Sequence, residues 1–193
     1  MTLLICDAQL IDPEAGTVKA GAVRIRDGMI SEICDAPNPP STGPELRIDA
    51  EGQFLAPGIV DLGVKICEPG ERHKESFRTA GLAAAAGGVT TMITRPDTMP
   101  VIDSPEQLEF VTRRASEAAP VNVYPMAALT KGFHGREMVE IGFLLDAGAV
   151  AFTDCDSVVT DTKVFSRCLT YARSLGALVI AHPQDPGLSE GAA

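Results

Sequence analysis

From residue 59 onward, short apolar segments alternate with amphipathic ones, and this alternation limits the fold more than any other feature of the sequence. The pattern predicts strands at about 59–66, 89–94, 121–129, 149–154 and 178–182, and helices at about 74–86, 104–118, 135–147 and 161–175. Ser104-Pro105 is typical of a helix start, and glycines at 87–88, 148 and 176 are typical of helix ends. A repeat of about 30 residues indicates βαβ units, whose strands are parallel.

These units predict an α/β fold, a (β/α)8 barrel of the TIM type in which only about five βα units are present. A complete barrel takes roughly 250 residues, whereas the whole chain has 193. Because a partial barrel exposes its apolar inner layers, we expect the native chain to be longer. A doubly wound open sheet of five strands is the competing architecture, although the sequence lacks its Gly-x-Gly-x-x-Gly turn.

Residues 1–56 have a different pattern, with short apolar strands separated by turns. Asp27-Gly28 lies between two alternating segments, AVRIR and MISEI, and predicts a two-residue hairpin. The segment 36–44 contains four prolines and no apolar periodicity, which predicts a surface loop. We therefore expect a small all-β unit ahead of the barrel, with the boundary between residues 56 and 57.

Composition excludes several classes of function. The chain has 16 basic and 26 acidic residues, a net charge of −10, which argues against a nucleic-acid partner because phosphate binding needs clustered cations. No apolar run approaches the 18 residues typical of a membrane span, so no membrane partner is expected. The five cysteines are odd in number and widely spaced, which favours reduced thiols and a cytoplasmic location.

The carboxyl ends of the strands are where a βα barrel carries its chemistry. Side chains able to bind a substrate or a metal follow four of the five predicted strands. They are Lys65 and Cys67, then Arg95 and Asp97, then Asp154, Cys155 and Asp156, and finally His182.

The run APGIVDLGVKICEPGERHKESFRTAGLAAAAGGVTTMITRPDTMPV resembles the dihydroorotases of the amidohydrolase superfamily. The family pattern is approximately Pro-Gly-x-x-Asp-x-His-x-His-x-Arg-Glu-Pro-Gly, then Lys-Glu, Gly-Gly-x-Thr-Thr and Met-Pro-Asn-Thr-x-Pro. The resemblance continues through GAVAFTDCDSV and VIAHPQD. It implies a composite protein in which residues 1–56 are the N-terminal part of a β-sandwich domain and residues 57–193 the N-terminal part of the barrel. It also implies zinc as the family's cofactor.

The departures from the family pattern concern the residues that carry the chemistry. Gly63 and Lys65 stand where the two first-strand histidines would bind zinc, and neither offers a lone pair at neutral pH. Cys67 replaces the arginine that holds the substrate carboxylate, and Asp97 replaces a substrate-contacting asparagine. In the Thr-Asp-Asp-Gly turn, Cys155 stands at the metal-binding aspartate. Only His182 matches a histidine ligand.

Simpler explanations exist for the remaining polar residues. A single imidazole cannot hold a metal alone, so we expect His182 to be a hydrogen-bonded side chain; His73 and His134 are expected at the surface. Cys155 is expected to be a small buried thiol, although a soft metal is an alternative, and Asp154 and Asp156 to cap the following turn. If Lys65 and Arg95 both point into the barrel mouth, they would neutralise the nearby acidic residues and stand where two metal charges once stood.

We favour a non-catalytic, structural dihydroorotase-like protein of pyrimidine biosynthesis, to which we assign no catalytic residue and no cofactor. The resemblance implies assembly with aspartate transcarbamoylase, and a homo-oligomer is the alternative assembly. The alternative function is an active zinc-dependent cyclic amidohydrolase with a rearranged site that uses His182 and Cys155. A third hypothesis is a protein that binds a small molecule in the old pocket without chemistry.

Overall fold

The structure, a computed structural model, describes residues 2–189 and contains two compact units, Met1–Pro57 and Gly58–Ala193. Each unit forms its own sheet and its own cluster of buried apolar side chains. The two units are described separately below.

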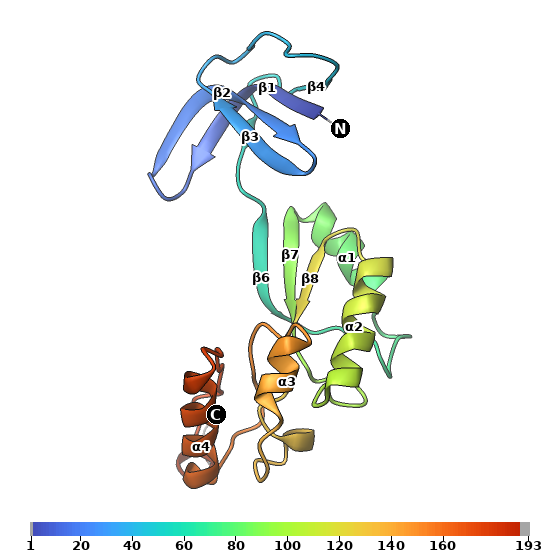
Figure 1. Cartoon of the computed structure of the whole chain (residues 1–193), viewed down its shortest axis with the longest axis vertical. Coiled ribbons are helices and arrows are strands. Elements are labelled where there is room, and N and C mark those ends of the chain that lie inside the picture. The colour runs from blue at the N-terminus through green and yellow to red at the C-terminus, as the bar shows by residue number, and fades with distance from the viewer. Residues whose placement is uncertain (1, 190–193) are drawn as a thin grey trace. The chain divides into compact units, whose positions relative to one another are not determined.

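The first unit is a mixed β-sheet. Its strands are β1 (Thr2–Asp12), β2 (Thr17–Arg26), β3 (Met29–Cys34), β4 (Leu46–Asp49) and β5 (Phe54–Leu55). The order is β3-β2-β1-β4, and β5 also pairs with β1. Neighbours β1, β2 and β3 run antiparallel, whereas β4 and β5 lie parallel to successive parts of β1 (Figure 1).

The hairpin predicted at Asp27-Gly28 is confirmed. Strand β2 ends at Arg26, which pairs with Met29 at the start of β3. Asp27 has a φ of 51° and Gly28 a φ of 81°, and two positive φ angles are what the favoured two-residue hairpin turn requires. The local sequence therefore fixes the register beside the turn, and an irregularity between Arg24 and Ile25 shifts it by one residue farther along the strands.

A buried cation ties the proline-rich segment 36–44 to this sheet. The Arg24 side chain on β2 is 2% exposed and forms ion pairs with Glu32 and with Glu45, the latter at 3.3 Å. Its Nη2 also donates to the carbonyl oxygen of Pro40 at 3.0 Å. Between β3 and β4 the structure has no helix or strand, as expected for a loop, but this loop is anchored through its backbone.

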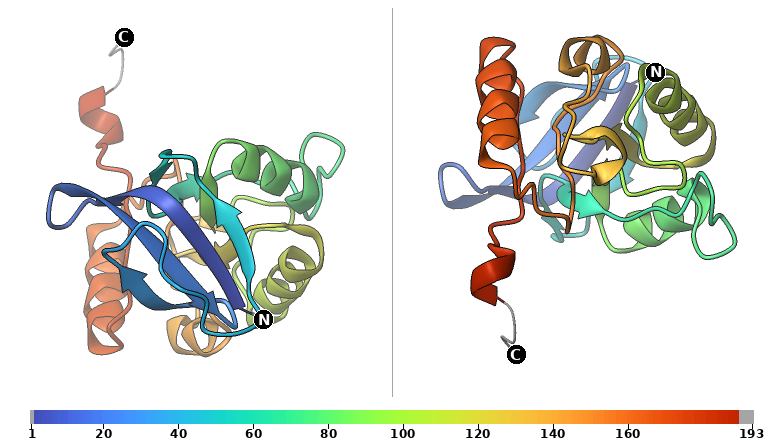
Figure 2. Two further views of the ribbon diagram at one scale, coloured as in Figure 1. Left: turned by 90° about the horizontal axis from the view of Figure 1, so that it is seen from above. Right: turned by 90° about the horizontal axis from the view of Figure 1, so that it is seen from below.

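The second unit alternates strands with helices. Its elements are β6 (Ile59–Val64), α1 (Phe77–Ala86), β7 (Val89–Thr94), α2 (Pro105–Ala118), β8 (Asn122–Pro125), η1 (Lys131–Phe133), α3 (Ile141–Asp146), α4 (Thr162–Ser174) and α5 (Pro186–Ser189). Helix α1 packs on β7 and α2 packs on β8, and the two helices contact each other (Figure 2).

Consecutive strands of this unit are also neighbours in space. Strands β6, β7 and β8 pair in that order, all parallel. Two parallel bridges extend the row, from Ala127 to Phe152 and from Phe152 to Val179. The five strand positions therefore follow chain order without a reversal, which is the order of a βα barrel and not of a doubly wound sheet.

Three elements are much shorter than the sequence predicts. The strands expected at 149–154 and 178–182 are each reduced to a single bridge, at Phe152 and Val179. The helix expected at 135–147 begins only at Ile141. Ahead of it, Gly132 and Gly135 have positive φ angles and the Gly135 N–H donates to the Thr130 hydroxyl, so this segment is held in a loop that a helix cannot continue.

The core of the second unit lies between the strand row and the helices, with Phe77, Met92, Leu108, Leu144 and Phe152 among its buried members. In contrast, apolar side chains at both ends of the row are exposed, among them Leu62 on β6 and Leu178 beside the last bridge. Parallel strands are normally covered on both faces, so these edges are open apolar surface. Within residues 2–189, no helix has the length and apolar character to cross a membrane.

A matched pair of leucines tests this division into core and open edge. Leu62 is 71% exposed, whereas Leu144 on α3 is fully buried. Leu62→Ser should reduce binding of a hydrophobic dye by this chain and change the free energy of unfolding by no more than about 0.5 kcal/mol. Leu144→Ser should lower the free energy of unfolding by roughly 3 kcal/mol or more, because it removes a core side chain and buries a hydroxyl. Equal destabilisation by the two substitutions in urea titrations would contradict the assignment of Leu62 to open surface.

Candidate functional site

The polar residues singled out in the sequence lie where the strands of the second unit end. Lys65 follows β6 directly, and Arg95 follows β7 directly. Asp156 comes four residues after the bridge at Phe152, and His182 three residues after the bridge at Val179. Because neighbouring parallel strands end at the same edge of a sheet, side chains far apart in the sequence meet there.

Four of these residues form one ion-pair network. Lys65 Nζ lies 2.9 Å from Asp97 Oδ2, and Arg95 Nη2 lies 3.0 Å from the same oxygen. Arg95 Nη2 also donates to Asp156 Oδ2 at 2.7 Å. The network thus joins the segments that follow three strand positions, and its two positive and two negative charges balance.

The pKa shifts in the network follow from these contacts. The hydrogen bond to Asp97 raises the pKa of Lys65, and the hydrogen bond to Asp156 raises the pKa of Arg95, so both stay cationic. The Arg95 guanidinium lowers the pKa of Asp156 below its usual value. Lys65, Arg95 and Asp156 are therefore charged at neutral pH. Solvent screens the exposed Lys65 and Asp156, so these pairs position the loops more than they stabilise the fold.

A small open cavity brings together five of the sequence-predicted residues. It has a volume of about 290 Å³, and Gly63, Arg95, Cys155, Asp156 and His182 line it together with neighbouring apolar groups. Gly63 has a φ of 87° and no side chain, so only its backbone contributes to the cavity wall. The cavity thus brings together residues that follow or end four of the strand positions.

Cys155 is a half-buried thiol that lines this cavity, and is thus less enclosed than the small buried thiol expected from the sequence. Burial raises the pKa of Cys155 to about 11, reinforced by the negative charge of Asp97 and opposed by Arg95. Without a bound metal the thiol therefore stays protonated at neutral pH and is a weak nucleophile. Cys67, at the position of the family's arginine, is half-buried in the loop after β6, and its carbonyl oxygen accepts the Glu71 N–H at 2.8 Å.

Asp154 has a different role from the turn cap expected for it. Its side chain reaches back to the previous loop, where Oδ1 accepts the backbone N–H groups of Leu129 at 2.9 Å and Thr130 at 2.8 Å. Its Oδ2 accepts the Thr130 hydroxyl. Burial raises the pKa of Asp154, and these hydrogen bonds oppose that rise. The expectation of a cap was wrong for Asp156 as well, because its carboxylate pairs with Arg95.

Glu68 is a structural residue to which the sequence analysis gave no role. Its side chain is buried, where Oε2 accepts the Phe77 N–H at the start of α1 and Oε1 accepts Arg114 Nε from α2 at 2.7 Å. Glu68 therefore fixes the loop after β6 against two helices. The only sequence signal was its place in Glu-Pro-Gly, because nothing in the sequence pairs it with a residue 46 positions away.

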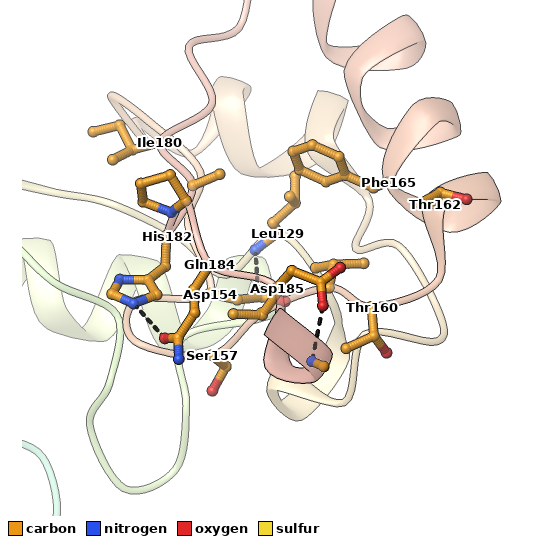
Figure 3. Close-up of a pocket in the computed structure, with 15 residues that line it drawn as sticks. Leu129, Asp154, Ser157, Thr160, Thr162, Phe165, Ile180, His182, Gln184 and Asp185 are labelled. Carbon is orange, nitrogen blue, oxygen red and sulfur yellow. Dashed lines mark hydrogen bonds between the residues drawn. The ribbon is translucent and has the colours of Figure 1, made fainter. Parts of the chain in front are cut away.

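A second, larger cavity shares His182 and its neighbours with the first, and Figure 3 shows the residues that line it. It has a volume of about 470 Å³ and is lined by apolar groups such as Leu129, Phe165 and Ile180 and by polar groups such as Asp154 and His182. His182 lines both cavities, and its Nε2 is 2.9 Å from Gln184 Oε1, so the hydrogen-bonded role expected for it agrees with its geometry.

The residues at the strand ends do not fit a zinc site. Gly63 offers no donor, and Lys65 is held as a cation by Asp97. Across residues 2–189, no three His, Cys, Asp or Glu side chains are grouped so that they could hold a metal ion. Within these residues, the surroundings of Gly63 and Lys65 therefore offer no replacement for the two histidines that the family pattern has there.

Comparison with known proteins places the sequence among dihydroorotases and related chains. A family model described as Dihydro-orotase-like matches residues 52–193. A dihydroorotase-like protein of Pseudomonas putida is 39% identical over 191 residues, which cover 99% of this chain and 45% of that protein. A dihydroorotase of Solibacter usitatus is also 39% identical over 191 residues, with 99% and 44% covered. This chain thus spans less than half the length of these relatives.

Comparison of structures supports the fold. The L-hydantoinase from Arthrobacter aurescens has a TM-score of 0.79 at 21% identity, covering 93% of this chain and 40% of the hydantoinase. A D-hydantoinase from Thermus sp. has a TM-score of 0.69 at 22% identity, with 93% and 40% covered. At this identity the likeness concerns the fold, and it agrees with a partial barrel preceded by a β unit.

Asp154 provides a test of how the site is held together. Asp154→Ala leaves two buried N–H groups and a hydroxyl without their acceptor and should lower the free energy of unfolding by about 3 kcal/mol in urea titrations. Asp154→Asn keeps an acceptor for the two N–H groups and should cost less than half as much. Because burial raises the pKa of Asp154, the wild type should lose stability relative to Asp154→Asn as the pH rises through the unfolded and then the folded pKa. A stability difference that does not change with pH would contradict this assignment.

Proposed function

Because this chain belongs to the dihydroorotase-like family, we propose that it is a non-catalytic member, which serves pyrimidine biosynthesis by assembling with aspartate transcarbamoylase. The observation that carries the loss of catalysis is the ion-pair network at the strand ends. Lys65 and Arg95 bind the protein's own carboxylates where the family, by resemblance, holds zinc and substrate.

The contrast between the chemistry and the scaffold supports this proposal. Residues that would bind zinc or the substrate carboxylate are replaced at Gly63, Lys65, Cys67 and Cys155. Residues that shape the loops keep well-defined contacts: Glu68 joins two helices, and a Cβ at Gly70 would come within 2.4 Å of the Met99 carbonyl oxygen. Such a division is expected when the protein is retained for its shape and not for turnover.

Assembly with aspartate transcarbamoylase rests on the sequence resemblance, since some chains of this family are structural partners of that enzyme. The cytoplasm is the proposed compartment, in agreement with five cysteines that are all free thiols. A homo-oligomer is the alternative assembly, and it would use the same retained scaffold.

An active cyclic amidohydrolase is the second candidate function. It is favoured by one observation, that His182, Cys155 and Asp156 line the same cavity. Zinc hydrolysis needs about three protein ligands and an open position for water. The two cations Lys65 and Arg95 oppose such a site in the described residues, so we favour the non-catalytic role.

Metal content and turnover separate these two functions. The full-length protein, purified without chelator, should contain no stoichiometric zinc by elemental analysis and should not hydrolyse dihydroorotate above the buffer rate. Gly63→His combined with Lys65→His should not restore turnover, because the substrate-binding arginine is still replaced by Cys67. The dihydroorotase of Solibacter usitatus, assayed in parallel, is the positive control. One tightly bound zinc per chain would refute the non-catalytic proposal.

The assembly role has its own test. Full-length protein mixed with aspartate transcarbamoylase from the same cell should elute with it as one large complex in size-exclusion chromatography with light scattering. The transferase alone should be smaller or less stable to heat, because binding stabilises the bound state. Lys65→Ala should leave the complex intact, since this residue belongs to the strand-end network. Independent elution of the two proteins at micromolar concentration would reject this partner.

A further inference from the structure

Two cations from adjacent strand ends converge on one carboxylate oxygen in this protein. Lys65 Nζ and Arg95 Nη2 lie 2.9 Å and 3.0 Å from Asp97 Oδ2. An ammonium and a guanidinium at this distance from one carboxylate are the charge-assisted contacts with which proteins recognise carboxylate ligands. Position 67, where the resemblance places the family's carboxylate-binding arginine, carries Cys67, so these cations come from other positions.

Asp97 satisfies the two cations incompletely. Both contacts use Oδ2, while Oδ1 is buried and has no hydrogen-bond partner among the described residues. Arg95 Nε is likewise buried without a partner in that part of the chain. A guanidinium binds a carboxylate best through two parallel hydrogen bonds, and Asp97 provides only one to Arg95. Free hydrogen-bonding capacity therefore remains on both sides of the contact.

We propose that Lys65 and Arg95 form a binding site for a small carboxylate, and that the Asp97 side chain occupies this site as an internal ligand. Being tethered two residues from Arg95, Asp97 competes at an effective concentration of about millimolar or higher, so the site is closed to dilute ligands. The lysine side chain is 58% exposed, which leaves one side of the site open to solvent. This inference rests on the ion pairs and is independent of catalysis and of assembly.

Removing the negative charge of Asp97 would open the site to an external carboxylate. With Asp97 present, the two cations are balanced by Asp97 and Asp156. Asp97→Asn keeps nearly the same side-chain shape, removes one negative charge and leaves the network with a net charge of +1. The variant should therefore attract an external carboxylate where the wild type does not.

The experiment is a titration with succinate, followed through the backbone amide signals of residues 63–65 and 95 by NMR, at constant ionic strength set with chloride. Asp97→Asn should bind succinate at least about tenfold more tightly than the wild type, because the tethered competitor is gone. Asp146→Asn, an exposed aspartate on α3, is the control with the same change in net charge. Adding Lys65→Ala or Arg95→Ala to Asp97→Asn should abolish the gain, and succinamide, which is uncharged, should not bind.

Several results would overturn the proposal. Equal affinity of the wild type and Asp97→Asn would show that Asp97 is not an occupant of a ligand site. An equal gain in Asp146→Asn would show a general effect of charge. Asp97→Ser is a second variant that removes the carboxylate, and the same gain is expected. If both variants failed to fold, Asp97 would be a structural residue and the proposal would be wrong. The outcome of this test does not depend on whether the protein binds zinc or aspartate transcarbamoylase.

Discussion

Parallel pairing of consecutive strands is the constraint on which the second unit depends. Because β6, β7, β8 and the bridges at Phe152 and Val179 all run in the same direction, every connection must return along the outside, and every strand ends at the same edge. The helices α1 and α2 supply these returns and bury the core. The same constraint brings Lys65, Arg95 and Asp156 within reach of one another although up to 91 positions separate them in the sequence.

Buried carboxylates then hold the loops that leave this edge. Glu68 accepts hydrogen bonds from the start of α1 and from Arg114, and Asp154 accepts three from Leu129 and Thr130. Each carboxylate is buried at a cost that its hydrogen bonds offset, so removing a partner is more disruptive than the strength of one contact suggests. In both cases an acidic residue next to the site holds loops in place, which distinguishes it from Asp97 and Asp156, the acids that pair with Arg95.

The charge balance of the strand-end network links this architecture to function. A hydrolytic metal site needs anionic or neutral donors around a cation, whereas here two side-chain cations are surrounded by two carboxylates. The charges of the strand-end network are thus balanced within the protein, although Asp97 Oδ1 and Arg95 Nε keep unused hydrogen-bonding capacity among the described residues. One chain can therefore keep the scaffold and loops of the family while the residues at its strand ends differ from the family pattern.

Local patterns in the sequence determined much of this protein: the βα alternation, the hairpin at Asp27-Gly28, the helix start at Ser104-Pro105 and the positions of polar residues at strand ends. These follow from periodicity and turn chemistry, which depend on residues close in the chain. Tertiary structure alone decided that Lys65 and Arg95 share Asp97, that Asp154 faces the previous loop, and that Glu68 meets Arg114. It also reduced the last two strands to bridges and shortened α3, the helix that ends at Asp146. Such pairings depend on which side chains the folded backbone brings within about 3 Å, and hydrogen-bond geometry at that range has no signature in a single sequence.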